Sequence, residues 1–119
     1  MQAVVEMQGF QRSAAHAGMT EDEIIRVVDI LAANPEAGDE IKGTGGCRKV
    51  RVAGRGKGKS GGYRVITFFS GPAIPLFLLY AYSKADRSDL EGAQRADLKR
   101  LTKVLLDEYR GARRLRSVP

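Results

Sequence analysis

The residues best able to do chemistry lie in one basic segment, GRGKGKSGGYR, at positions 54–64. Its Gly58-Lys59-Ser60 matches the end of a nucleotide-binding P-loop, which also needs a glycine five positions before Gly58 and a helix directly after the loop. Position 53 is Ala53, and YRVITFF at 63–69 is rich in β-branched and aromatic residues, which predicts a strand. We therefore expect a cationic loop for a phosphate other than that of ATP or GTP.

Several familiar catalytic groups are missing around this segment. The single histidine, His16, is far from it in the sequence, so one chain cannot form the histidine pair that some ribonucleases use. One cysteine and one histidine cannot make a tetrahedral zinc site. A Cys47–His16 nucleophile pair is possible on paper, but Cys47 is expected to pack as a small hydrophobic residue. We expect no metal and no cofactor.

The remaining groups suit the cleavage of RNA, which carries its own nucleophile in the 2′-OH. The protein must then supply a base, donors for the charge that develops on the phosphate, and an acid for the 5′-oxygen. Arginine binds phosphate with two parallel hydrogen bonds, and a lysine can act as a base where neighbouring positive charges lower its pKa. Lys57 and Lys59 lie among such neighbours, Arg55, Arg64 and Arg51. A loop of this composition is nevertheless more often only solvated, or a phosphate contact without catalysis.

The charge of the chain is segregated. The net charge is +6, and the first 41 residues carry eight acids against Arg12 and Arg26. This predicts a positive face that binds a polyanion, most commonly nucleic acid. A protein that binds an anionic membrane surface normally has a basic amphipathic helix, and the sequence shows none. The segment 42–84 contains no Asp or Glu, which also argues against paired-carboxylate or magnesium-dependent catalysis, and its basic residues are Lys42, Arg48, Lys49, Arg51, Arg55, Lys57, Lys59, Arg64 and Lys84.

The composition predicts one cytoplasmic domain over residues 1–119. A chain of 119 residues can bury one modest core. A single cysteine excludes an internal disulfide and fits a reducing compartment. MQAVVEMQGF at the start does not resemble a secretory signal, and the longest apolar stretch, 72–82, is shorter than the roughly 20 residues that span a bilayer.

Three helices are expected around the basic segment. Residues 9–18 predict a short helix or turn closed by Gly18. Thr20 and Glu23 form a capping box that begins a second helix, with Ile24, Val27, Val28 and Leu31 as its apolar stripe, and Asn34-Pro35 ends it. A long C-terminal helix is expected to begin with Asp86 or Ser88 as its cap and to end at Gly111, followed by a basic tail at 112–119.

Strands are predicted at 47–52, 63–69 and about 74–82, with a weaker one at 4–7. The first three form an antiparallel meander, and the element order predicts an α+β domain with helices packed on one side of the sheet. The hairpin brings Arg51 and Arg64 close together, and Tyr82 and Lys84 share a strand face near the loop. Tyr63, Tyr80 and Tyr82 are either sheet residues or platforms for stacked bases.

The order of these motifs resembles the RelE/HigB family, toxins of bacterial type II toxin–antitoxin systems. The resemblance covers about residues 20–105 and rests on GTGG followed by RK-x-R at 43–51, GKGKSGGYR at 56–64 and YSK with DL at 82–90. It implies a compact α+β ribonuclease fold that cleaves messenger RNA in the ribosomal A site by 2′-OH attack without a metal. It also implies a cognate antitoxin, usually a helix-turn-helix repressor.

The resemblance also assigns roles to residues. Lys57 and Lys59 match the loop lysines linked to base action and phosphate stabilisation, and Arg64 matches the arginine that holds the scissile phosphate. Lys84 stands where the family places a basic acid or phosphate ligand. No aromatic residue that could stack on a base follows Lys84 directly. The residues expected to contact RNA are Arg48, Lys49, Arg51, Arg55, Tyr63 and Tyr82.

Two other functions use the same basic face. A non-catalytic module would bind RNA or DNA there, and a protein without enzymatic activity would use the face only to recognise an acidic antitoxin. All three functions require the cationic side chains to gather at one place.

Overall fold

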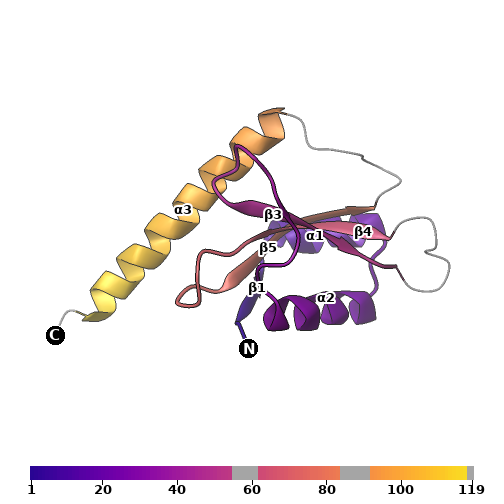
Figure 1. Cartoon of the computed structure of the whole chain (residues 1–119), viewed down its shortest axis with the longest axis horizontal. Helices are drawn as coiled ribbons and strands as arrows, with labels where there is room; N and C mark the ends of the chain where they lie inside the picture. Colours follow the sequence, from indigo (N-terminus) through magenta and orange to yellow (C-terminus); the bar gives the residue numbers. More distant parts are fainter. Residues whose placement is uncertain (55–61, 84–91, 118–119) are drawn as a thin grey trace.

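The computed structural model describes residues 1–54, 62–83 and 92–117, and within the last helix it describes the side chains of 94–109. Within these ranges the strands form one five-stranded sheet in the order β1-β5-β4-β3-β2 (Figure 1). The elements in chain order are β1 (Val4–Glu6), α1 (Gln8–Ala17), α2 (Glu21–Ala33), β2 (Asp39–Glu40), β3 (Cys47–Val52), β4 (Tyr63–Phe68), β5 (Leu76–Ser83) and α3 (Gly92–Ser117).

The predicted meander is confirmed. β3 pairs with β4 and β4 with β5, both antiparallel, with a bulge on β5 opposite Ile66 and Thr67. The weak N-terminal strand is also confirmed as β1, which pairs with β5 in parallel at Val4↔Leu76. The sequence pattern does not predict the two-residue strand β2, in which Asp39 pairs with Lys49. It is too short for sequence periodicity to reveal.

The α+β class is confirmed, but the expectation that all helices pack on one side of the sheet is wrong. α1 and α2 bury Phe10, Val27 and Leu31 against one face, whereas α3 buries Leu105 against the other. Figure 1 shows α2 and α3 on opposite sides of the sheet. The physical reason is that Val65–Phe68 and Leu76–Leu79 are buried at every residue, so the two central strands need cover on both faces.

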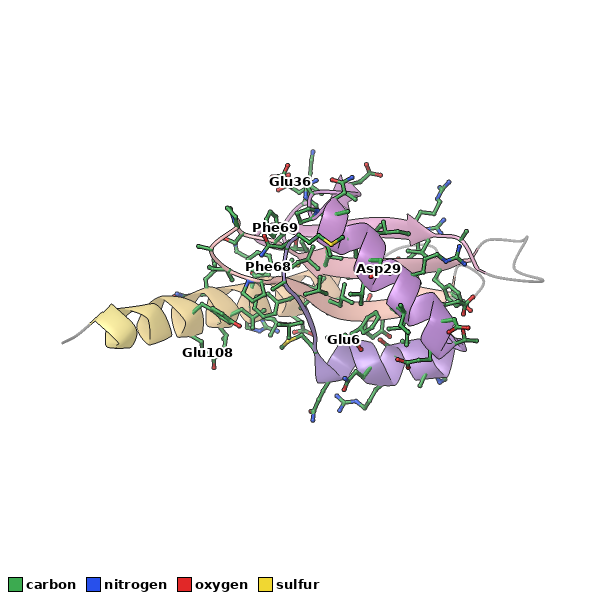
Figure 2. All side chains as sticks on the ribbon, turned by 90° about the horizontal axis from the view of Figure 1, so that it is seen from below. Glu6, Asp29, Glu36, Phe68, Phe69 and Glu108 are labelled. Carbon is green, nitrogen blue, oxygen red and sulfur yellow. The ribbon has the colours of Figure 1, made fainter. Side chains whose placement is uncertain are left out.

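Consecutive residues therefore belong to two different cores. Val65 lies with α1 and α2, and Ile66 lies with α3. The α3 core, made of Cys47, Ile66, Phe68, Ile74, Phe77, Leu79, Tyr82 and Leu105, is completed by side chains of α3. The ring of Tyr109 meets that of Phe77 edge-on at 5.5 Å. Carboxylates such as Glu36 and Glu108 point outward from this framework (Figure 2).

The helix ends follow local rules where the structure describes them. The Thr20–Glu23 capping box is present, and Gly18 closes α1 with φ of 85°. The expected caps Asp86 and Ser88 lie outside the described residues. α3 continues to Ser117, so its expected end at Gly111 is wrong and 112–117 are helical. Ala, Arg and Leu in that stretch are strong helix formers, and one interior glycine costs only about 1 kcal/mol.

The GTGG motif at 43–46 forms the joint between β3 and α3. The Thr44 hydroxyl donates to Ile41 O at 2.6 Å and accepts from Cys47 N–H at 3.1 Å. Thr102 of α3 donates to Thr44 O at 3.1 Å. Gly45 has φ of +80°, and a Cβ there would lie 2.7 Å from Thr102 Oγ1, so only glycine fits against the helix. The joint fixes α3 over its face of the sheet.

Replacing Thr44 with valine is expected to lower the free energy of unfolding by about 1–3 kcal/mol, because a buried Cys47 N–H loses its acceptor. Thr67→Val is the matched control, since the buried Thr67 hydroxyl has no hydrogen-bond partner among the described residues. That variant should change stability by less than about 0.5 kcal/mol or increase it. Urea denaturation measures both variants. Equal losses in the two would contradict this account of the joint.

Candidate active site

Three of the predicted site residues lie in one row across the meander. Arg51 pairs in register with Arg64, and Arg64 pairs with Tyr82. Directly paired residues in antiparallel strands point to the same face, with Cα atoms about 4.5–5.5 Å apart. This face also carries Ile66 and Phe68, so it is the α3 side of the sheet. The predicted proximity of Arg51 and Arg64 is therefore confirmed, and we call these three residues the Arg51–Arg64–Tyr82 row.

The next row along the strands contains Lys49, Ile66 and Tyr80 in register. Arg51 is exposed, Lys49 and Arg64 are half-buried, and Tyr82 is buried at 3% exposure. No residue of β3, β4 or β5 is an Asp or Glu. The α3 side of the meander thus combines three cations and two tyrosines on rigid strands that carry no carboxylate, an arrangement that suits a phosphate group.

The strand ends that carry this row also carry the two segments with the predicted lysines. Val52 and Tyr63 are register partners at the mouth of the hairpin, and Tyr63 also pairs with Ser83. A Cβ on Gly62, which has φ of +64°, would collide with Val52 O, so glycine is needed where the hairpin arms meet. Arg55, Lys57 and Lys59 between the arms, and Lys84 after Ser83, lie outside the described residues.

Arg48 and Tyr63 lie on the opposite face of the sheet from the row. Arg48 Nη1 donates to Gly38 O at 3.2 Å near the β2 edge. The Tyr63 hydroxyl donates to Glu23 Oε1 at 3.1 Å, and Glu23 also accepts from Thr20 N–H in the capping box. Burial and the bond to Glu23 raise the pKa of Tyr63. The structure thus does not bring these two expected RNA contacts to the row, and Tyr63 ties the start of β4 to α2.

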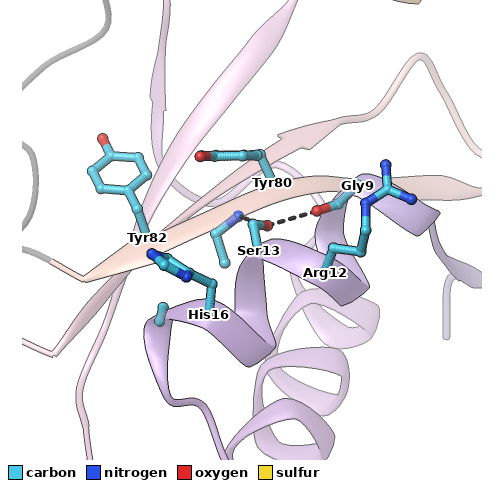
Figure 3. A pocket seen from close by; sticks show the side chains of 8 residues that line it. Gly9, Arg12, Ser13, His16, Tyr80 and Tyr82 are labelled. Carbon is cyan, nitrogen blue, oxygen red and sulfur yellow. Dashed lines mark hydrogen bonds between the residues drawn. The ribbon is translucent and has the colours of Figure 1, made fainter.

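A groove between α1 and β5 lies at the end of the row (Figure 3). It has a volume of about 400 Å³ and is lined by Arg12, Ser13 and His16 from α1 and by Tyr80 and Tyr82 from β5. His16 is far from the basic segment in the sequence, but α1 runs along the edge of β5 and places it in the same groove as Tyr82. The signal in the sequence is the spacing of Gly9, Arg12 and His16, which puts them on one face of a helix.

Cys47 does not take part in this site. It lies in the α3 core on β3, and His16 lies beyond β5, so the two do not form a nucleophile pair. Burial raises the pKa of the Cys47 thiol from 9.0 to about 11, against a smaller lowering by Thr44. The expectation that Cys47 packs as a small hydrophobic residue is confirmed. Among the described residues, no three His, Cys, Asp or Glu side chains gather as a metal site.

Comparison with known proteins identifies the family. A family model described as the RelE toxin of the RelE / RelB toxin–antitoxin system matches residues 2–113. The chain belongs to the RelE toxin family. Its fold is similar to that of E. coli toxin RelE, solved as a double arginine-to-alanine mutant in the free state, with a TM-score of 0.53 and 12% sequence identity over 73% of this chain and 87% of that one.

Family membership confirms the resemblance carried by the GTGG, GKGKSGGYR and YSK motifs. The protein is a toxin of a toxin–antitoxin system, which implies an antitoxin partner, and RelE toxins are in general endoribonucleases. Identity of 12% to E. coli RelE shows a shared fold and assigns no roles to individual residues. Over the described residues of this RelE toxin, no helix is long and apolar enough to cross a bilayer.

The raised pKa of Cys47 predicts how the stability of this RelE toxin depends on pH. The unfolded thiol ionises near pH 9 and the folded one near 11, so its contribution to stability is complete below about pH 9 and is lost as pH rises to about 11. Cys47→Ala removes this contribution. Urea denaturation at intervals from about pH 8 to 11 should show the difference between wild type and variant narrowing across this window. A constant difference would contradict a buried, protonated thiol.

Proposed function

We propose that this RelE-family toxin is a metal-independent endoribonuclease that cuts translated messenger RNA at the ribosomal A site, in the cytoplasm. The observation that carries the proposal is the Arg51–Arg64–Tyr82 row, which puts two arginines at directly paired positions on a sheet face whose strands carry no carboxylate. Two neighbouring arginines repel each other, and a bound phosphate relieves that repulsion.

The reaction uses the 2′-OH of the RNA as nucleophile. A base removes its proton, the 2′-oxygen bonds to phosphorus, and the bond from phosphorus to the 5′-oxygen breaks as an acid protonates the leaving oxygen. The products are a 2′,3′-cyclic phosphate and a free 5′-OH. In this reaction the base takes one proton from the 2′-OH and the acid gives one proton to the 5′-oxygen. Lysine and arginine side chains can therefore supply all the groups that it requires, and no cofactor is needed.

The roles follow the family motif. Arg64 holds the scissile phosphate, and Arg51 and Lys49 neutralise the charge that develops on it. Lys57 and Lys59 act as the base and as a further phosphate ligand, Arg55 contacts the RNA, and Lys84 is the acid or a phosphate ligand. Tyr82 is only 3% exposed and belongs to the α3 core beside Arg64, so it is left out of the proposed contacts with RNA. Arg48 and Tyr63, which face the other way, are left out of the proposed chemistry.

The antitoxin is proposed to be a helix-turn-helix protein encoded alongside the toxin. The basic α3 side of the sheet would be covered by an acidic or apolar segment of that protein, or a docked domain would block entry into the ribosome. An acidic segment would neutralise the same cations that bind RNA.

Arg64→Ala is expected to lower the cleavage rate about 10²–10³-fold, the usual cost of losing one donor to the developing charge. The assay induces the chain in bacteria and maps new 5′ ends on translated messages. The matched control is Arg26→Ala, which removes the same charge from the exposed surface of α2. Growth arrest with intact messages, or cuts that persist in Arg64→Ala, would overturn the proposal. Binding without cuts would favour a non-catalytic module.

The nucleophile is tested on the substrate. A message with a 2′-O-methyl group at the cleaved position, supplied to the purified toxin and translating ribosomes, should remain intact because the 2′-oxygen has no proton to lose. A Lys57→Ala, Lys59→Ala double variant should lose nearly all activity on the unmodified message. Cutting of the methylated linkage would exclude 2′-OH attack, and full activity of the double variant would exclude lysine as base.

A further inference from the structure

We propose that the groove between α1 and β5 binds the nucleotide next to the linkage held by Arg64. Its base would lie against Tyr80 and its phosphate against Arg12 and His16. This inference rests on the proposed function, since it adds a subsite for the same RNA.

The size and lining of the groove fit a nucleotide. A volume of about 400 Å³ falls among ordinary ligand sites, which range from about 300 to 1,000 Å³. Its lining combines an arginine and a histidine with two tyrosines, and none of the lining residues is a carboxylate. Arginine binds phosphate through two parallel hydrogen bonds, and a tyrosine ring stacks on any base. An apolar ligand would not need Arg12, and a simple anion would not need the tyrosine rings, so the lining favours a ligand with both a phosphate and a base.

The groove is built on rigid elements. Phe10 and Ala14 of α1 are fully buried under the sheet. The Ser13 hydroxyl donates to Gly9 O at 2.7 Å and accepts from Ala81 N–H at 2.9 Å, which joins α1 to the edge of β5 (Figure 3). A Cβ on Gly9 would lie only 3.2 Å from Leu79 O, so the glycine allows the helix to approach the strand this closely. Arg12 and His16 are therefore presented by a fixed helix, as a specific subsite requires.

The groove continues the row. Tyr82 lines the groove and is also the register partner of Arg64. The rings of Tyr80 and Tyr82 lie 6.2 Å apart at an angle of 42°. Neighbouring strands are about 4.8 Å apart, so a chain that crosses from Arg51 over Arg64 to Tyr82 covers roughly 10 Å and arrives at His16. An extended single strand can thus contact the row with one phosphate and the groove with the adjacent nucleotide.

The test uses two tetranucleotide RNAs that carry 2′-O-methyl groups throughout, so that they cannot be cut. One RNA has 2-aminopurine on the 5′ side of the central linkage, and the other has it on the 3′ side. Stacking on Tyr80 is expected to quench the fluorescence of 2-aminopurine in one of the two RNAs. The Arg12→Ala, His16→Ala double variant, altered at exposed helix positions, should bind that RNA about tenfold more weakly. Tyr80→Leu, which keeps an apolar side chain, should remove the quench.

Arg26→Ala is again the control for lost charge, and it should bind and quench like the wild type. The inference is overturned if the double variant and Tyr80→Leu match Arg26→Ala, or if the wild type shows no quench with either RNA. Cleavage of translated messages, measured on the same variants, separates the two proposals. If cleavage depends on Arg64 but the groove variants bind and cut like the wild type, only the subsite proposal is contradicted. If the groove variants weaken binding but no message is cut, only the nuclease proposal is contradicted.

Discussion

The in-register pairing of β3, β4 and β5 is the constraint on which the site depends. It places Arg51, Arg64 and Tyr82 side by side on one face, and a slip of one residue in either pair would turn one member to the other face. The register is held by burial. Val65 and Ile66 are fully buried on opposite sides of β4, so neither face can take the other's residues without exposing a core side chain.

Because the sheet is buried on both faces, different helices cover different parts of it. α3 covers Phe68 and Phe77 and extends to Ile66 and Tyr80, and Arg51 and Arg64 lie one row further along the same face. α1 lies at the edge of β5, where the short strand β1 pairs only as far as Leu78. Ser13 bonds to Ala81 N–H beyond that point, so the helix stabilises a free strand edge and creates the groove with the same contact.

Much of this could be predicted from local sequence. The capping box of α2, the alternation of β3 and the closeness of Arg51 and Arg64 follow from spacing alone, and they are present. The side of the sheet that α3 covers could not be predicted, because buried strands such as Val65–Phe68 do not say which helix covers which face. The groove at His16 was missed for a similar reason. Helical spacing groups Arg12 with His16, but only the tertiary fold brings them to Tyr82.

The central claim is that Arg51 and Arg64 bind the same phosphate because they are directly paired on neighbouring strands. A double-mutant cycle on the cleavage rate tests it most directly, with Arg51→Ala, Arg64→Ala and the double variant compared with the wild type. We predict strong non-additivity, in which the double variant loses much less than the product of the single losses, as for groups that act as a unit. Losses that simply multiply would show that the two arginines act on separate parts of the RNA, and would contradict the account.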